Sequence, residues 1–196
     1  MPTAPQVRAV TPLDLPAVAR LSRLAGRAAP ENEEDVIVRH LSAYLSAGGS
    51  IYLATDQGAI DGYVLCRQIE PLFYAVDRSV ILDVVFVAPA ERRRGIGHAL
   101  LLAVANHARE AQAGYVYATP SASDRNMHRF LASLGFAPLG GNRVVATQVL
   151  ARRLVKEHPI TQGIAIRSKP RTPARTPIDE VIAKRKRARS SDNAPK

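Results

Sequence analysis

Cysteine is almost absent from this chain of 196 residues. Cys66 is the only one, which excludes an intrachain disulfide and a cysteine-rich zinc module. His98 and His107 do not have the spacing of metal ligands, so we expect no metal site. The longest apolar run, residues 99–105, is too short to span a bilayer. The first ten residues contain no apolar signal core, and we therefore expect a cytoplasmic protein without a membrane partner.

Acidic residues are the minority charge, and the basic excess is concentrated at one end. The chain has 27 Lys and Arg against 17 Asp and Glu, a net charge of +10. Residues 156–196 hold 11 of the basic residues and four of the acidic ones, a net charge of +7, which leaves +3 for residues 1–155. The high basicity therefore describes the terminal segment more than the body of the protein.

The composition changes at about residue 156. Residues 168–177 contain three prolines, several basic residues and almost nothing apolar, so we expect disorder there. We divide the chain into a folded domain, 1–155, and a basic, Pro-rich tail, 156–196. The tail is either a solvated extension or an electrostatic tether to nucleic acid. We favour the solvated extension, because no aromatic residue beyond Phe136 offers a stacking platform for single strands.

Hydrophobic periodicity and turn residues predict an α/β domain. Strands are predicted over residues 7–10, 51–55, 60–68, 79–87, 115–119, 136–139 and 143–150. Helices are predicted after the Thr11–Pro12 start signal, over residues 33–46, from the glycines at 95 and 97 to Gly114, and over residues 123–134. A turn at residues 56–58 and a loop at 71–78 connect strands. This order of elements indicates a mixed sheet covered by helices.

One segment between the most apolar strand and the longest helix has the features of a phosphate-binding loop. It runs Arg92-Arg93-Arg94-Gly95-Ile96-Gly97. The glycines remove Cβ atoms where a ligand approaches the backbone, and the first amides of the helix have no intrahelical acceptor. Such an arrangement binds phosphate, and arginines add charge and forked donors. Gly95 and Gly97 could instead form only a tight turn, and some of the arginines could be merely solvated.

Two common phosphate-binding motifs do not fit this segment. A Walker A loop ends in Gly-Lys followed by Ser or Thr, whereas His98 follows Gly97 here. A dinucleotide fingerprint needs a third glycine, and that position holds Leu100. Neither motif therefore accounts for this segment.

The segment from Val87 to Leu101, with Pro89 and the Arg-Gly-x-Gly core, resembles the acetyl-CoA signature of the GNAT superfamily of N-acetyltransferases. Residues 129–136, Arg-Phe-Leu-Ala-Ser-Leu-Gly-Phe, resemble that family's Leu-Tyr-x-x-x-Gly-Phe helix end. The two motifs occur in the family's order and at its usual separation. The resemblance covers residues 7–150 and excludes the tail.

The resemblance implies a GNAT-like mixed, splayed sheet of about seven strands flanked by helices, with acetyl-CoA wedged where two strands part. It implies that pantetheine pairs with the main chain at Val85, Phe86 and Val87, and that the amides of residues 93–98 receive the pyrophosphate. It also implies that the acetyl group passes directly from the thioester to an amine, without a covalent enzyme intermediate. The cofactor-binding residues predicted in this way are Val85, Phe86, Val87, Arg92, Arg93, Arg94, Gly95, Ile96, Gly97, His98, Asp124 and Asn126.

The chain departs from the family pattern at two positions. Leu131 replaces the Tyr that commonly protonates the departing thiolate, and Asp124, with Asn126 two places on, replaces an Asn that contacts the cofactor. Asp124 and Asn126 also fit a role as helix caps. Tyr115 or Tyr117 on the next strand could replace the acid, although both also fit simple packing, and Tyr117 is our candidate.

Asp83 is the candidate catalytic base, because relatives commonly carry a Glu on this strand. An acid in an apolar strand could equally be the structural partner of an arginine. Strand alternation places Asp83 on the same face as Val85 and Val87.

These residues predict an N-acetyltransferase that acts on a primary amine of a small molecule or protein. The alternative is a CoA-binding module that has lost catalysis and whose tail engages nucleic acid or a protein partner. No readable motif identifies the acceptor or the acyl chain length, and the expected assembly is a monomer or a homodimer.

Overall fold

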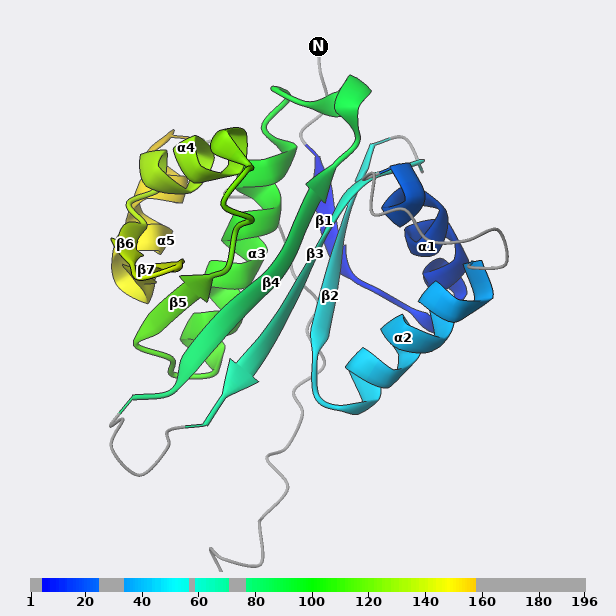
Figure 1. Cartoon of the computed structure of the whole chain (residues 1–196), viewed down its shortest axis with the longest axis horizontal. Helices are drawn as coiled ribbons and strands as arrows, with labels where there is room; N and C mark the ends of the chain where they lie inside the picture. The colour runs from blue at the N-terminus through cyan, green and yellow to red at the C-terminus, as the bar shows by residue number, and fades with distance from the viewer. Residues whose placement is uncertain (1–4, 25–33, 57–58, 71–76, 158–196) are drawn as a thin grey trace, which may run out of the picture.

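The computed structural model describes residues 5–24, 34–56, 59–70 and 77–157 (Figure 1). Residues 57–58 of the predicted turn at 56–58, most of the predicted loop at 71–78, and the tail from residue 158 onward lie outside these ranges.

A mixed seven-stranded sheet runs through the centre of the protein, in the order β1-β2-β3-β4-β5-β7-β6. All neighbouring strands are antiparallel except β4 and β5, which are parallel. The strands are β1 (Gln6–Ala9), β2 (Ser50–Asp56), β3 (Ala59–Ile69), β4 (Ser79–Val87), β5 (Tyr115–Ala118), β6 (Ala137–Leu139) and β7 (Asn142–Ala146). The predicted mixed sheet of seven strands is confirmed.

Helices lie on both faces of the sheet (Figure 1). The α-helices are α1 (Leu15–Leu24), α2 (Glu34–Ser46), α3 (Ile96–Glu110), α4 (Arg125–Ser133) and α5 (Thr147–Glu157), and two short 3-10 helices are η1 (Pro12–Asp14) and η2 (Pro89–Glu91). Helices α1 and α2 cover one face, whereas α3, α4 and α5 cover the other. None of the helices in the described ranges is long and apolar enough to cross a membrane.

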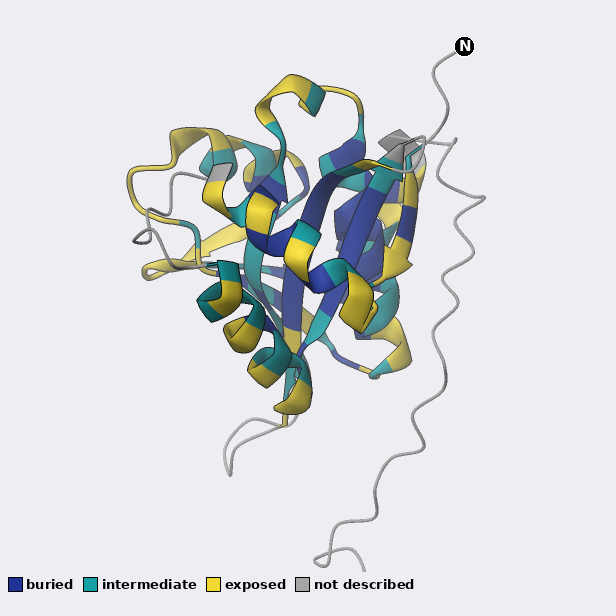
Figure 2. Ribbon diagram, turned by 90° about the vertical axis from the view of Figure 1, so that its right-hand side faces the viewer, coloured by how far each residue is buried: buried dark blue, intermediate teal, exposed yellow. Residues whose placement is uncertain are grey.

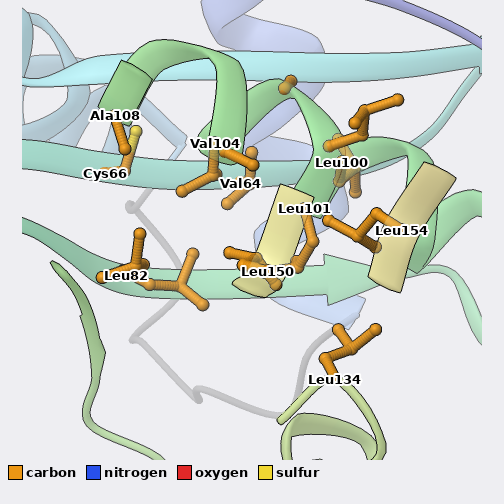
Figure 3. Packing of buried hydrophobic residues seen from close by; sticks show 14 of the residues in the cluster. Val64, Cys66, Leu82, Leu100, Leu101, Val104, Ala108, Leu134, Leu150 and Leu154 are labelled. Carbon is orange, nitrogen blue, oxygen red and sulfur yellow. The ribbon is translucent and has the colours of Figure 1, made fainter. Parts of the chain in front are cut away.

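Each face of the sheet has its own hydrophobic core, and the central strands are buried between them (Figure 2). The α3-side core is the larger one and packs α3 and α5 against the sheet (Figure 3). It includes Val64, Cys66, Leu82, Leu100, Leu101, Val104, Leu134, Leu150 and Leu154. The α1–α2-side core includes Val18, Leu21, Leu41, Ile51, Leu53, Tyr63, Leu65 and Phe86.

The predicted helix start at Thr11 is a capping box that also holds the edge strand. The backbone amide and hydroxyl of Thr11 both donate to the Asp14 carboxylate, at 2.8 and 2.7 Å. Arg8 of β1 donates to both oxygens of the same carboxylate at 2.7 Å. These hydrogen bonds, that from Arg8 above all, hold the pKa of Asp14 well below its usual range. One carboxylate thus joins strand β1 to the beginning of the first helix.

The predicted strand over residues 143–150 is wrong in its second half. Strand β7 ends at Ala146, and α5 begins at Thr147 and continues to Glu157, two residues past the predicted domain boundary. The hydroxyl of Thr147 donates to the carbonyl of Ala113 at 2.7 Å, and its amide donates to the carbonyl of Gly114 at 2.9 Å. These two bonds end the ladder, and burial of Leu150 and Leu154, one helical turn apart, favours the helix over the β propensity of the segment's first residues.

Candidate active site

Strands β4 and β5 part halfway along β4. They pair only from Ser79 to Leu82, opposite Tyr115 to Ala118, although β4 continues to Val87. Beyond Leu82 the edge of β4 that faces away from β3 has no neighbouring strand among the described residues. Val85, Phe86 and Val87 lie on this open edge, where the resemblance places the pantetheine contacts. The predicted splay is therefore present in the sheet (Figure 1).

The Arg-rich loop lies at the end of this open edge and leads into α3. Arg93 and Gly95 both adopt left-handed backbone conformations, with φ of 65° and 82°. Gly95 is the N-cap of α3, and the first intrahelical bond runs from the amide of Ala99 to the carbonyl of Gly95. The amides of Ile96, Gly97 and His98 therefore precede the helical hydrogen-bond pattern. A turn of this kind followed by a helix N-terminus is suited to binding an anion.

The three loop arginines are all exposed, but they differ in their contacts. Nε of Arg92 donates to the carbonyl of Val87 at 3.3 Å, and Arg94 forms an ion pair with Glu91. The side chain of Arg93 forms no hydrogen bond or ion pair with any residue that the structure describes. Arg93 is thus the loop arginine whose whole guanidinium is available to a ligand.

Gly97 faces Phe130, which the sequence analysis included only in the segment 129–136. A Cβ atom at Gly97 would lie 3.2 Å from Cζ of Phe130 on α4. The Phe130 ring also meets the His98 ring edge-on, with centroids 5.3 Å apart. The absence of a side chain at Gly97 therefore lets α4 approach the first turn of α3. Phe130 becomes part of the predicted phosphate site through this contact, which sequence periodicity alone does not reveal.

Asp83 does not share a face with Val85 and Val87, so that prediction is wrong. In the β3–β4 ladder Leu65 pairs with Val84 and Cys66 pairs with Leu82, which leaves Asp83 as an extra residue in a β-bulge. Val85 and Val87 pack on the α3-side core, whereas Val84 packs on the α1–α2-side core. The bulge interrupts the alternation and turns both Asp83 and Val84 toward α1 and α2.

The carboxylate of Asp83 is held by two donors. The phenol of Tyr44 on α2 donates to Oδ2 at 2.8 Å, and Nε of Arg67 on β3 lies 3.0 Å from Oδ2 and 3.3 Å from Oδ1. Burial and the contact with Asp83 raise the pKa of the Tyr44 phenol well above its usual value, so that it stays a donor. The Asp83 side chain remains 23% exposed and the Arg67 side chain 50% exposed. Asp83 is therefore the partner of an arginine and still accessible to a ligand.

Tyr44 and Arg67 are site residues that the sequence analysis missed. Tyr44 belongs to the apolar stripe of the second helix, and packing explains it there. Arg67 is a charged residue in a mostly apolar strand, and that anomaly was the available signal. Arg67 pairs with Ile81, two residues before Asp83, so alternation places Arg67 and Asp83 on one face, and the bulge removes Val85 and Val87 from that face.

Tyr117, the candidate acid, lies on the same face as Asp83. Val116 and Ala118 of β5 are buried in the α3-side core, so alternation turns Tyr115 and Tyr117 to the opposite face. Tyr117 pairs with Ile81, two residues before Asp83 on the neighbouring strand. Leu131, by contrast, is 1% exposed in the α3-side core. The structure thus brings Tyr117 and Asp83 to adjacent strands and leaves position 131 without a polar group.

Asp124 and Asn126 have local partners at the start of α4. Asp124 is the N-cap, and its Oδ1 accepts the amide of Met127 at 2.9 Å. The side-chain oxygen of Asn126 accepts from Arg129 at 3.0 Å. Both residues are exposed. Asp124 therefore acts as the helix cap that was its alternative interpretation, and a contact with the cofactor stays a prediction for both.

The thiol of Cys66 lies away from the open edge of β4. Cys66 is buried in the α3-side core, and burial raises the pKa of its thiol to about 12, so it is neither exposed nor ionised at neutral pH. Across the described parts of the chain, no three His, Cys, Asp or Glu side chains form a group that could hold a metal ion.

Comparison with known proteins shows which family the sequence matches. Residues 18–136 match the sequence model of the acetyltransferase (GNAT) family, and this range includes the bulge, the Arg-rich loop, α3 and α4. No curated protein matches the chain.

Solved structures share the fold. The ribosomal-protein-alanine N-acetyltransferase of Brucella melitensis is 26% identical, with a TM-score of 0.55 over 68% of this chain and 85% of that one. An acetyltransferase of Trypanosoma brucei is 20% identical, with a TM-score of 0.57 over 69% and 94% of the two chains. The PaiA N-acetyltransferase of Thermoplasma acidophilum, in complex with coenzyme A, is 14% identical, with a TM-score of 0.57 over 72% and 97%.

Proposed function

Because the chain belongs to the acetyltransferase (GNAT) family, we propose that it binds acetyl-CoA and transfers the acetyl group directly to a primary amine. The observation that carries this proposal is the continuity of the open β4 edge with the loop and the N-terminus of α3. A long ligand with a diphosphate at one end and a reactive group at the other fits such a track.

The residues along the track fit the chemistry of a coenzyme A thioester. The main-chain groups of Val85 and the amide of Val87 point away from β3 and are available to the amides of pantetheine, whereas those of Phe86 face β3. The amides of residues 93–98 and the guanidinium of Arg93 offer donors and positive charge to the pyrophosphate. The four residues of β4 beyond the bulge span about 13 Å between these two ends of the site.

The polar groups at the bulge support a role for this region in proton transfer from the acceptor amine. The thioester supplies the acetyl group; the chain has to position the amine and move its protons. Asp83 accepts a hydrogen bond from the acceptor ammonium and then its proton, and Tyr44 and Arg67 hold the carboxylate in place. Tyr117, on the same face, is the proposed donor of a proton to the leaving sulfur. One N–C bond forms and one C–S bond breaks, which yields an amide and a free thiol.

The first experiment separates binding from turnover. We expect acetyl-CoA and CoA to raise the melting temperature of the full chain, and thiol release from acetyl-CoA to depend on an added amine. Dephospho-CoA lacks only the 3′-phosphate and pantetheine lacks every phosphate group, so pantetheine should stabilise the protein least. If neither CoA form stabilises the protein, the proposal fails. Stabilisation without thiol release on a broad amine panel would instead indicate a coenzyme-binding protein without catalysis.

A further inference from the structure

The pairing of Arg67 with Asp83 points to the kind of amine that the site accepts. Nε of Arg67 donates to Asp83. Within the described ranges no residue accepts a hydrogen bond from its two terminal nitrogens. Half of the side chain is exposed, so these nitrogens can reach a ligand. An arginine that served only to neutralise Asp83 could instead turn its paired fork toward the carboxylate.

The carboxylate of Asp83 can also accept a further hydrogen bond from a ligand. Its Oδ2 accepts from both Tyr44 and Arg67, whereas Oδ1 has only the longer contact of 3.3 Å with Arg67. A carboxylate oxygen can accept two hydrogen bonds, so Oδ1 can still receive an ammonium group. The site therefore presents an anionic acceptor and a cationic fork side by side.

A ligand that satisfies both groups carries an amine and a carboxylate separated by one carbon atom. Because Asp83 and Arg67 are in contact, a longer spacer would have to fold back to reach both. The neighbouring surface is apolar: Ile81 pairs with Arg67 on one side and with Tyr117 on the other. Tyr115, on the same face of β5, is 42% exposed. This row offers a floor for an apolar or aromatic side chain.

We infer that the acceptor is a free α-amino acid with an apolar side chain, whose carboxylate binds the terminal nitrogens of Arg67 and whose amine binds Asp83. This inference rests on the proposed function, since it assigns the substrate class of that site. It excludes a peptide N-terminus as the preferred acceptor, because a peptide bond replaces the carboxylate there by a neutral amide.

The test compares free amino acids with their amides. Calorimetry at about pH 7, where the α-amines are mainly protonated, measures binding of phenylalanine, leucine and methionine and of the corresponding amides to the CoA-loaded protein. We expect the free acids to bind at least about tenfold more tightly than the amides. Thiol release with the same compounds should show this preference in KM rather than in kcat.

Two arginine variants make the test specific. In Arg67→Gln the preference for the free acid should vanish, and in Arg67→Lys it should be reduced. Arg78→Gln is the matched control, since Arg78 is 47% exposed and also contacts a carboxylate, that of Glu70, through Nε. It should retain the preference. If Arg67 only positioned Asp83, Arg67→Gln would weaken acids and amides equally.

The two proposals fail in different ways. Equal affinity for acids and amides, or no binding of either, overturns the amino-acid assignment. If the enzyme then acetylates amides or simple amines, the proposed function stands. Absence of stabilisation by acetyl-CoA and CoA overturns the proposed function. Binding of the free acids through Arg67 is a separate measurement, because calorimetry does not require turnover.

Discussion

The phenol of Tyr44 and the carboxylate of Asp83 lie 2.8 Å apart and join helix α2 to the bulge of β4. The contact is half-buried, and the phenol is the donor because burial and Asp83 raise its pKa. A packing residue of the second helix thus fixes the orientation of the carboxylate nearest the splay. Movement of α2 relative to the sheet would displace this carboxylate directly.

Replacement of Asp83 should separate catalysis from coenzyme binding. In Asp83→Asn we expect kcat to fall by about 100-fold, because the proton acceptor for the amine is lost, while stabilisation by acetyl-CoA is retained. Tyr44→Phe keeps the carboxylate and removes one of its donors, so the loss should be smaller. Glu70→Gln, which removes the partner of Arg78, is the control and should keep full activity. Equal kcat in Asp83→Asn and the parent would remove Asp83 as the base.

The left-handed conformation of Gly95 allows a matched test of the phosphate site. Gly48, at the turn after α2, has a similar φ of 91°, and a Cβ there would have nothing within 4 Å. Each Gly→Ala variant should lose about 1 kcal/mol of stability from backbone strain. Only Gly95→Ala should also lose affinity for CoA, measured as the ligand-induced shift of melting temperature. Equal ligand-induced shifts in both variants would argue against the proposed pyrophosphate position.

The elements around the splay were the most predictable part of the fold. Strand β4 has the predicted limits, because an apolar run interrupted only by Asp83 is followed by Ala88-Pro89. The glycines at 95 and 97 mark the beginning of α3, which was also predicted from the local sequence alone. Helix α5 was missed because its stability comes from contacts of Leu150 and Leu154 with the α3-side core, and its first residues have β propensity.

The site was less predictable than the fold, because its polar groups depend on register. Strand alternation is a period of two, and one extra residue at Asp83 reverses every assignment on one side of the bulge. The reversal separates Asp83, with its partners Arg67 and Tyr44, from the face of Val85 and Val87. Phe130 illustrates the same limit for helices, since its contact with Gly97 depends on how closely α4 approaches α3.

The part-buried pair of Tyr52 and His107 should make stability depend on pH. The phenol oxygen of Tyr52 and Nδ1 of His107 lie 3.0 Å apart, and burial lowers the pKa of His107, although Glu110 acts in the opposite direction. The folded state thus favours the neutral ring. Its contribution is complete above the unfolded pKa of about 6.5 and is lost as the pH falls through the folded pKa.

Urea unfolding at several pH values between about 7.5 and 5 measures this effect. The parent protein should lose more stability on acidification than His107→Gln, which cannot be protonated. Carboxylates contribute equally to both proteins, so the difference between the two curves is the informative quantity. Parallel curves would show that His107 does not contribute to the pH dependence.

Gly97 has two possible reasons to lack a side chain, and a double-mutant cycle separates them. One is the close approach of Phe130, 3.2 Å from the position of an added Cβ, and the other is the approach of the pyrophosphate. Gly97→Ala should cost about 1 kcal/mol or more through crowding against the ring. Adding Phe130→Leu should recover part of that loss, because the smaller side chain leaves room for the methyl group.

The CoA-induced shift of melting temperature gives the second readout of this cycle. If the phosphate group also needs the space at Gly97, the double variant should be more stable than Gly97→Ala and still bind CoA weakly. Phe130→Leu alone provides the reference for any direct contact between the ring and the ligand. Recovery of both stability and CoA affinity in the double variant would mean that the glycine serves helix packing alone. The pyrophosphate would then be held by the backbone of residues 93–96 and by Arg93, without close approach to Gly97.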